Sequence, residues 1–551
     1  FPRGAPDAGR LGGQSEPETV SAKGLRASPR EAAAQLASGL AAFGLADHPL
    51  KVPRLLATAL AAGGVSVAGA LLAAGRVWGE AAAVVDAAGV VSYRSLAGRA
   101  ERLATALAPF GARQVALLLD DDRDFLIALA AAGLTGARVT PVSDRLGLGR
   151  LRALGADNRF DLVLHADSQV LEAQALAGSA RLAARDQWAG LVGAVRGRPP
   201  PRRGRASRLV MLTSGSTGRP RAVPIKARPG APLTAIALAG PTGVRHGQPA
   251  LICPPLSHGF GLQVAVLCLV CGAPMVLASA IGQERTRLGL AGAEGYGAAL
   301  ARLAGRWQVG TVFAVPTQLR RLAAQLRAAA PGLEVPPLPS VRRVVSGSEL
   351  LDAATVETLN NYWGPVVVNY YGSTETGTVT VAGPQVTARH PGAVGRPAAG
   401  TRIWVVGDDG EVSRPGRIGR IRIASPLAQL SDPGTAGAPA GVWTTSDLGY
   451  CDGDGLLHIV GRSDGLVRAG GEFSHPQLVA DLLAGLPGVA AARAWSESDP
   501  DFGGRIAAAV ELAEASAWTA GALRAEVRSR LGPAHTPVRI ETNHSNAALA
   551  E

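Results

Sequence analysis

The chain has 551 residues, more than one compact core usually holds, so two or more domains are expected. Hydrophobic residues make up 47% and charged residues 18%, which is typical of globular proteins and excludes a largely disordered chain. The net charge of +12 comes mainly from arginine, because the chain has only three lysines. The densest arginine cluster, residues 196–208, has three consecutive prolines and no aromatic residue to stack on bases, which favours a solvated linker over a nucleic-acid site.

Residues 1–50 are expected to form a mobile tail, because Gly, Pro, Ser and charged residues dominate its first part. The uncharged run 55–75 is long enough to cross a bilayer, but it is rich in Ala and Gly and lacks flanking aromatics, which favours a buried helix. Cys268 and Cys271 form a CxxC pattern inside an apolar run with no second pair nearby, which favours buried thiols over zinc or redox chemistry. Together with the absence of a signal-peptide pattern, this predicts a cytoplasmic protein.

From residue 90 onward, short apolar strands alternate with amphipathic helices. The periodicity predicts helices near 95–111 and 125–137. It predicts strands at 90–96, 114–120, 138–142, 208–212, 249–255, 273–278, 309–316, 341–347 and 365–372. Such alternation indicates an α/β fold, in which helices cover both faces of a parallel sheet.

The pattern changes near residue 395. Short strands and turns predict a β-rich subdomain at about 395–462, the last part of a large domain that spans 51–462. Residues 463–551 mix a strand pair with amphipathic helices, which predicts a small α+β domain at the C-terminus.

A loop of Thr, Ser and Gly follows the strand at 208–212. Its backbone N–H groups and hydroxyls suit a polyphosphate, although an ordinary turn also fits this composition. It is not a Walker A loop, because no Gly-Lys-Ser/Thr follows. The residues are Thr213, Ser214, Gly215, Ser216, Thr217 and Gly218, with Arg221 just beyond them.

A second polar segment, Asn369 to Glu375, closes the strand at 365–372. An aromatic residue, a glycine, hydroxyls and a carboxylate at the end of a strand suit a nucleotide site with Mg²⁺. Further along, Asp447 and Arg462 are placed to hold ribose hydroxyls.

Four segments occur in the order and spacing of the adenylate-forming superfamily: TSGSTGRPR, NYYGSTE, TTSDLGYCDGDGLLHIVGRSD and VRAGGEFSHP. The chain resembles the AMP-dependent acyl-CoA synthetases of that superfamily from about Val90 nearly to its end. The resemblance implies a large N-terminal domain of doubly wound mixed sheets with a β-barrel-like subdomain. It also implies a small mobile C-terminal domain and ATP, Mg²⁺ and a CoA or phosphopantetheine thiol as cofactors and substrates.

The resemblance also implies roles for the site residues. The loop from Thr213 to Gly218 would wrap the β- and γ-phosphates, and Tyr371 would stack on adenine. Thr374 would lie near the α-phosphate, and Glu375 would bind Mg²⁺. The remaining cofactor-binding residues implied by the motifs are Arg221, Ser346, Gly347, Ser348, Asn369, Gly372, Asp447, Arg462 and Gly471.

Two implied roles belong to the small domain. Asp464 resembles the hinge about which that domain turns between half-reactions. Gly471 resembles the glycine that lets a pantetheine arm pass.

The segment 254–261 resembles the acyl-pocket segment of CoA synthetases, in which His258 would orient the carboxylate. Relatives that activate amino acids carry an Asp in this segment to pair with the substrate ammonium, and none occurs here. We therefore expect a fatty or aromatic acid as substrate.

Three departures from the family pattern leave alternatives open. Arg221 and Arg468 stand where the family usually has Lys, and no lysine follows Lys226, although the family's catalytic lysine would fall at or shortly beyond Glu551. The small domain is therefore expected to be incomplete, or the lysine is absent from this protein.

The leading hypothesis is an acyl-CoA synthetase, and transfer to the phosphopantetheine of an acyl-carrier protein is the second. A non-catalytic nucleotide-binding relative and an enzyme that uses another oxyanion or nucleophile remain as alternatives.

Overall fold

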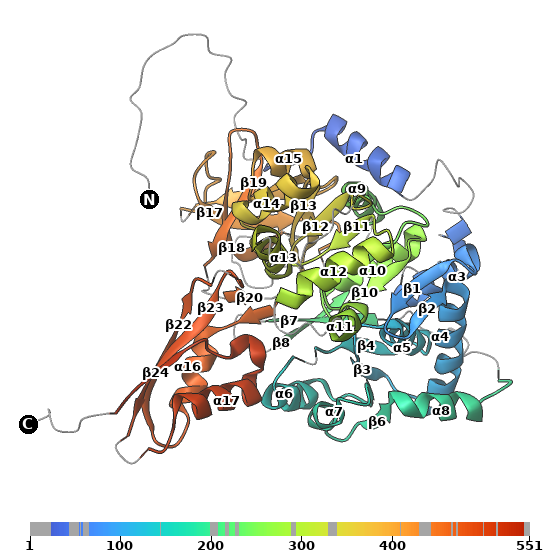
Figure 1. Cartoon of the computed structure of the whole chain (residues 1–551), viewed down its shortest axis with the longest axis horizontal. Coiled ribbons are helices and arrows are strands. Elements are labelled where there is room, and N and C mark those ends of the chain that lie inside the picture. Colours follow the sequence, from blue (N-terminus) through green and yellow to red (C-terminus); the bar gives the residue numbers. More distant parts are fainter. Residues whose placement is uncertain are drawn as a thin grey trace, which may run out of the picture.

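The computed structural model describes residues 24–42, 54–55, 57–58, 66–143, 145–198, 208–214, 220–225, 231–287, 294–328, 339–407, 409–428, 442–463, 467–469, 472–499, 501–513 and 516–544. Within these ranges, a large region built on two sheets carries a smaller α+β unit at its C-terminal end (Figure 1).

The larger sheet has 13 strands within the described ranges. Five adjacent strands, β12, β11, β9, β10 and β1, are parallel, and β13 joins β12 in parallel before the sheet turns antiparallel at β14. In spatial order the strands are β16 (Arg402–Val406), β17 (Gly419–Ala424), β18 (Trp443–Cys451), β19 (Leu457–Arg462), β15 (Ala393–Pro397), β14 (Gly377–Ala382), β13 (Val367–Ser373), β12 (Arg343–Ser346), β11 (Thr311–Phe313), β9 (Ala250–Ile252), β10 (Met275–Leu277), β1 (Ala82–Asp86) and β2 (Gly89–Ser92).

A second sheet of six strands lies beside the first. It is parallel except for the final pair, β7 and β8, which is antiparallel. Its order is β6 (Arg181–Ala184), β5 (Leu162–His165), β3 (Gln114–Leu118), β4 (Arg138–Pro141), β7 (Arg208–Ser214) and β8 (Pro220–Ile225).

Helices cover both faces of the larger sheet. One core joins the two sheets through α3 (Val67–Trp78), α4 (Tyr93–Leu107), α5 (Arg123–Leu134) and α10 (Gly259–Cys271). A separate core packs the other face with α11 (Ala278–Arg287), α12 (Glu294–Arg306), α13 (Pro316–Ala328) and α14 (Ala353–Trp363). Further helices that the structure describes in the large region are α1 (Pro29–Ala42), α6 (Leu148–Asn158), α7 (Val170–Ala177), α8 (Trp188–Ala194), α9 (Ala231–Thr242) and α15 (Pro384–Arg389).

Local chemistry accounts for where these helices begin. Ser92 caps α4, since its hydroxyl accepts a hydrogen bond from the Ser95 N–H, and Asp122 caps α5 in the same way for Asp124 and Phe125. The apolar face of each helix then packs on the sheet, and this burial supplies most of the stabilisation.

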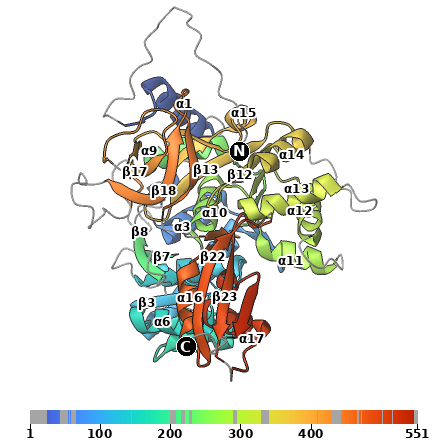
Figure 2. The same ribbon diagram turned by 90° about the vertical axis from the view of Figure 1, so that its left-hand side faces the viewer.

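The C-terminal unit has its own core. It consists of the hairpin β20 (Val467–Ala469) and β21 (Glu472–Ser474), the sheet β22 (Val489–Glu497), β23 (Arg505–Leu512) and β24 (Ile540–His544), and the helices α16 (Pro476–Ala484) and α17 (Ala520–Leu531). α17 contacts α6, and Figure 2 shows the unit beside the six-stranded sheet.

The expected fold class is confirmed, and the strand and helix pattern lies close to the predicted ranges. The β-rich region at 395–462 continues the larger sheet through β15 and β19. Within the range 1–50, predicted as a mobile tail, α1 is folded and packs on α9; residues 1–23 and 43–50 lie outside the described residues.

The described parts of the two apolar runs agree with the predictions; residues 56 and 59–65 of the run 55–75 lie outside the described residues. α3 is a buried helix, and no helix in the described ranges is long and apolar enough to span a membrane. Cys268 and Cys271 are free, buried thiols, and burial raises the pKa of Cys268 to about 12.

Candidate nucleotide and acyl site

Two neighbouring strands carry buried polar side chains at the same level of the sheet. Ser346 at the end of β12 and Asn369 in β13 are register partners, and both are almost completely buried. Asn369 donates its amide N–H to Ala393 O at 3.1 Å, but the Ser346 hydroxyl and Asn369 Oδ1 have no hydrogen-bond partner in the described part of the chain. A buried polar atom without a partner costs free energy unless a ligand or water completes it. These two oxygens therefore indicate a place for a polar ligand.

The turn after β12 has an unusual backbone. Ser348 has φ +74°, a left-handed conformation that is uncommon outside glycine and often found at functional sites. A Cβ on Gly347 would lie 3.1 Å from Tyr370 O, so the turn lies tightly on β13. The segment 346–348 thus forms a close-fitting wall next to the end of β13.

Three predicted ribose and adenine residues form one hydrogen-bonded chain. Tyr371 donates its hydroxyl to Asp447 Oδ2 at 2.8 Å, and Arg462 donates to Asp447 Oδ1 at 3.2 Å. Asp447 in β18 and Arg462 in β19 are direct register partners, and Asp447 is 4% exposed. The structure therefore brings these three side chains, from three strands, to one place.

The hairpin between β13 and β14 carries Thr374 and Glu375 at its tip. Gly372 has no room for a side chain, because a Cβ there would collide with Gly377 O. Ser373 and Thr376 close the tip through hydrogen bonds between their hydroxyls and backbone. Both Thr374 and Glu375 are partly buried, so they lie at the surface of the site and can meet a ligand.

His258 stands at the N-terminus of α10, beside this hairpin. Its Nδ1 lies 3.2 Å from the Ser257 hydroxyl. A Cβ on the next residue, Gly259, would lie 3.5 Å from the Thr374 hydroxyl. The N-terminus of a helix favours negative charge, so the space between His258 and Thr374 suits an anion.

The base of the predicted phosphate loop lies on β7 and β8. Thr213 pairs in register with Arg221, and the buried Thr213 hydroxyl has no partner in the described part of the chain. The Arg221 guanidinium lies 5.7 Å from the ring centre of Trp443, on the strand that also carries Asp447. Gly215, Ser216, Thr217 and Gly218 lie outside the described residues, as do Asp464 and Gly471; for Ser214 only its place in β7 is described.

Sequence patterns did not single out Asp121, which follows β3. Its Oδ1 accepts a hydrogen bond of 2.6 Å from the backbone N–H of Leu256, in the segment that carries His258. The acidic run at 120–124 marks the end of a buried strand, but Leu256 follows β9 of the other sheet, so no pattern in the sequence predicts this contact. Burial, with a smaller contribution from Asp124, raises the pKa of the neighbouring Asp122 to about 6.

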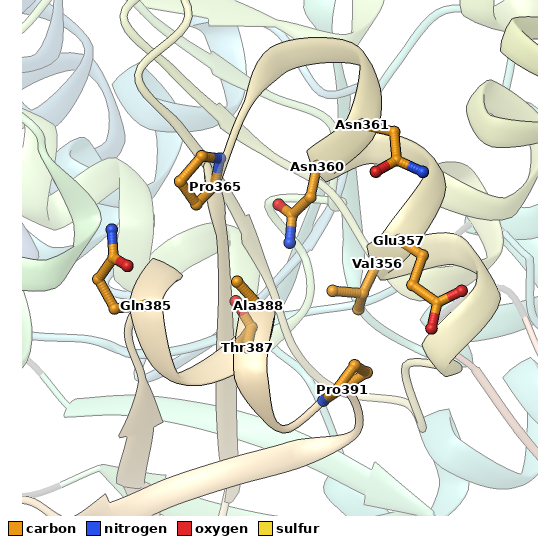
Figure 3. A pocket seen from close by; sticks show the side chains of 9 residues that line it. All are labelled: Val356, Glu357, Asn360, Asn361, Pro365, Gln385, Thr387, Ala388 and Pro391. Atoms are coloured by element: carbon orange, nitrogen blue, oxygen red, sulfur yellow. The ribbon is translucent and has the colours of Figure 1, made fainter.

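A cavity of about 280 Å³ lies apart from this cluster, between α14 and α15 (Figure 3). No residue predicted for the site lines it. The lining residues are Val356, Glu357, Asn360, Asn361, Pro365, Gln385, Thr387, Ala388 and Pro391.

A parallel sheet with a polar cluster at its strand ends, beside a helix N-terminus, is the architecture of a nucleotide-dependent enzyme. Residues 71–430 match the family of AMP-binding enzymes. The chain therefore belongs to that family, and the predicted class of AMP-forming enzyme in the adenylate-forming superfamily is confirmed.

Curated relatives agree with the family. The chain is 29% identical over 481 residues to a feruloyl-CoA synthase of an Amycolatopsis species, covering 84% of this chain and 92% of the relative. It is 31% identical over 360 residues to a sulfoacetate–CoA ligase of Cupriavidus necator, covering 61% of this chain and 64% of the relative.

Solved structures show the same fold. An amide bond synthetase from Marinactinospora thermotolerans superposes with a TM-score of 0.73 at 25% identity, covering 87% of this chain and 96% of the other. A malonyl-CoA ligase with methylmalonyl-CoA and AMP bound superposes with a TM-score of 0.68 at 26% identity, covering 86% of this chain and 97% of the other.

Proposed function

We propose that this chain joins a carboxylic acid to the thiol of CoA at the expense of ATP. An acid oxygen attacks the α-phosphate, the bond to the β-phosphate breaks, and pyrophosphate leaves with an acyl-adenylate formed. The thiol sulfur then attacks the acyl carbon, loses its proton and displaces AMP. The observation that carries this proposal is the single hydrogen-bonded chain of Tyr371, Asp447 and Arg462, together with the oxygens of Ser346 and Asn369 that have no partner among the described residues.

The nucleoside would occupy this cluster. Asp447 has lone pairs left on both oxygens for ribose hydroxyls, and the hydrogen bond from Arg462 orients the carboxylate. The adenine would lie against Tyr371 and the segment 346–348, where its amino group would donate to a buried oxygen such as Asn369 Oδ1.

The donor set at the hairpin tip fits Mg²⁺. This ion prefers oxygen ligands and commonly takes one or two carboxylates together with substrate phosphates. Glu375 would provide the carboxylate next to Thr374 and the phosphates. When bound, the ion offsets the negative charge of the phosphates, while Thr374 and the residues around it hold the α-phosphate in line with the acid.

The acid would bind between His258 and the hairpin. The α10 N-terminus favours its carboxylate, and His258 would orient it. Two residues after His258, the ring of Phe260 contacts that of Phe313 edge to face, with 6.4 Å between the ring centres. This apolar surface at the start of α10 supports an uncharged aromatic or fatty acyl group. Relatives named for feruloyl and indoleacetate groups, both of which contain a ring, match over 84% and 82% of this chain.

The acceptor would be CoA, since the first curated relatives are CoA synthases and ligases. The phosphopantetheine of a carrier protein presents the same thiol and remains an alternative. An amine is a second candidate acceptor, supported by the resemblance in fold to an amide bond synthetase. In each case, residues 463–551 would form a domain that turns about Asp464, with Gly471 lining the path of the thiol, and the enzyme would work in the cytoplasm.

ATP with Mg²⁺ is expected to raise the melting temperature of the chain, because a ligand that binds only the folded state stabilises it. Glu375→Gln should reduce the shift given by ATP with Mg²⁺ by at least half and leave the shift given by AMP alone unchanged. Differential scanning fluorimetry measures both. If neither ATP nor AMP changes the melting temperature at millimolar concentration, the proposed function is wrong.

A further inference from the structure

Two loops far apart in sequence meet on α13, one from each domain. The first is the segment 346–352, which follows β12 and begins with the wall of the candidate nucleotide site. The second is the turn 499–503, between β22 and β23 of the C-terminal unit. Arg320 lies between the two loops, with its side chain 10% exposed. Because a guanidinium has five donors in a planar fork, one arginine can bind acceptors from both loops.

On the large-domain side, Arg320 holds the segment that continues from Ser348. Its Nε donates to Asp352 Oδ2 at 2.9 Å, and its Nη2 donates to the Leu350 carbonyl at 2.7 Å. Its Nη1 lies 3.6 Å from Glu349 Oε2, which also accepts from the Thr317 hydroxyl at 2.8 Å. The conformation of 349–352, and with it the strained Ser348, therefore depends on this guanidinium.

Asp352 is itself firmly placed. It caps α14 by accepting from the Thr355 N–H at 2.8 Å. Burial alone would raise the pKa of Asp352, but hydrogen bonds from Thr355 and Arg320 hold this pKa below its usual value. The carboxylate is thus charged at neutral pH and fixes the position of Arg320.

On the C-terminal side, Arg320 and its neighbour hold the turn 499–503. Arg320 Nη1 donates to the Asp501 carbonyl at 3.3 Å. Gly503 has φ +79°, and a Cβ there would lie 3.0 Å from Arg320 Nη2, so the close approach requires glycine. The Arg321 guanidinium lies 4.8 Å from the ring centre of Phe502, in cation–π contact.

The turn is shaped for this contact in advance. Asp499 Oδ1 accepts from the N–H groups of Asp501 and Phe502 at 2.9 and 2.8 Å, and Gly503 N–H donates to the Asp499 carbonyl at 2.8 Å. A preorganised turn loses little conformational entropy when it docks. The free energy of docking therefore depends mainly on the contacts with Arg320 and Arg321.

We propose that Arg320 is a positioning residue that couples the nucleotide-site segment 346–352 to the docking of the C-terminal turn 499–503. A ligand that orders 346–352 favours one placement of Arg320, and that placement favours the docked turn. The proposal rests on the proposed function for its ligand, the adenosine of AMP. Arg320 acts through its neighbours and does not touch the reacting atoms.

Hydrogen exchange of the full chain with and without AMP tests the coupling. In the wild type, AMP should slow exchange both at 346–352 and at 499–503. In Arg320→Lys, one ammonium cannot bind the acceptors of both loops. AMP should then still protect 346–348, while its protection of 499–503 falls by about fivefold or more, the usual size of a coupling between sites. Equal protection of 499–503 in the variant and the wild type would overturn the proposal.

Arg321→Lys is the matched control, because it makes the same exchange one residue away and keeps a cation over Phe502. It should retain the wild-type response. Gly503→Ala changes no residue of α13 or of the nucleotide segment and presses on Arg320 only from the side of the turn, so it provides a second variant if Arg320→Lys fails to fold. It should expose 499–503 without AMP and leave the AMP protection of 346–348 intact; wild-type protection at 499–503 would contradict the docking. If AMP protects 346–352 in the wild type but not 499–503, the coupling fails and the proposed function stands. If AMP protects neither segment, both fail.

Discussion

Asp447→Ala is expected to weaken AMP binding about 100-fold or more, since a charged hydrogen bond contributes about 1.5–3 kcal/mol and the ribose would lose two acceptors. The change also leaves Arg462 and the Tyr371 hydroxyl without the partner that they share in the structure. Isothermal titration calorimetry with AMP measures the loss. Tyr371→Phe removes one hydrogen bond from the chain and should weaken binding less, by about tenfold.

Asp452→Asn is the matched control for Asp447. Asp452 is also a carboxylate in the same antiparallel region, where it accepts from His458 at 2.9 Å, but it lies outside the candidate site. Its replacement should leave AMP affinity unchanged. If Asp447→Ala folds normally and binds AMP as tightly as the wild type, the nucleoside does not bind at Asp447.

A lower pH is expected to weaken the contact between the two domains, because it favours protonation of His535. This residue is 2% exposed; burial, with Arg150 at 3.2 Å and His475 nearby, lowers its pKa to about 3. The folded state therefore favours the neutral ring, and stability is lost as the pH falls from about 6.5 towards 3. Between pH 7 and pH 5 the loss of stability should be about 2 kcal/mol, since each pH unit below the unfolded pKa of His535 corresponds to about 1.4 kcal/mol.

Protection of α17 amides from hydrogen exchange at pH 7, 6 and 5, corrected for intrinsic exchange rates, measures this loss. His535→Gln should remove most of the pH dependence. His390→Gln is the control, because the His390 side chain is 35% exposed and lies 3.9 Å from Asp454, away from α17. A pH dependence that survives in His535→Gln would show that another group is responsible.

Much of this architecture could be predicted from local sequence. The strands β3, β12 and β13 lie where short apolar runs predicted them, because their buried residues are contiguous in sequence. The same holds for Thr374, Glu375 and Asp447, which directly follow or occupy such strands. Family resemblance added the roles, which periodicity alone does not supply.

Other features depend on contacts between distant segments and left no local pattern. The bond from Leu256 to Asp121 joins residues 135 apart, and the bond from Arg320 to Asp501 joins residues 181 apart. α1 differs, because its Ala-rich stretch at 31–42 favours a helix, and the Gly-, Pro- and Ser-rich composition that suits a mobile tail ends near residue 30. Its packing on α9 is again a contact between distant segments. Propensity and periodicity carry no information on such pairings.

The position of an oxygen atom from the acid after the reaction shows whether the chain forms an acyl-adenylate. The chain is incubated with ATP, Mg²⁺, CoA and an acid labelled with ¹⁸O in its carboxylate, chosen from a panel of aromatic, fatty and α-amino acids by pyrophosphate release. If an acyl-adenylate forms, the oxygen that attacked the α-phosphate stays on phosphorus, so the AMP recovered after long incubation carries one ¹⁸O atom. Mass spectrometry of AMP reads this result independently of the rate. AMP without ¹⁸O, together with an acid that keeps its full ¹⁸O label, would contradict activation through an acyl-adenylate.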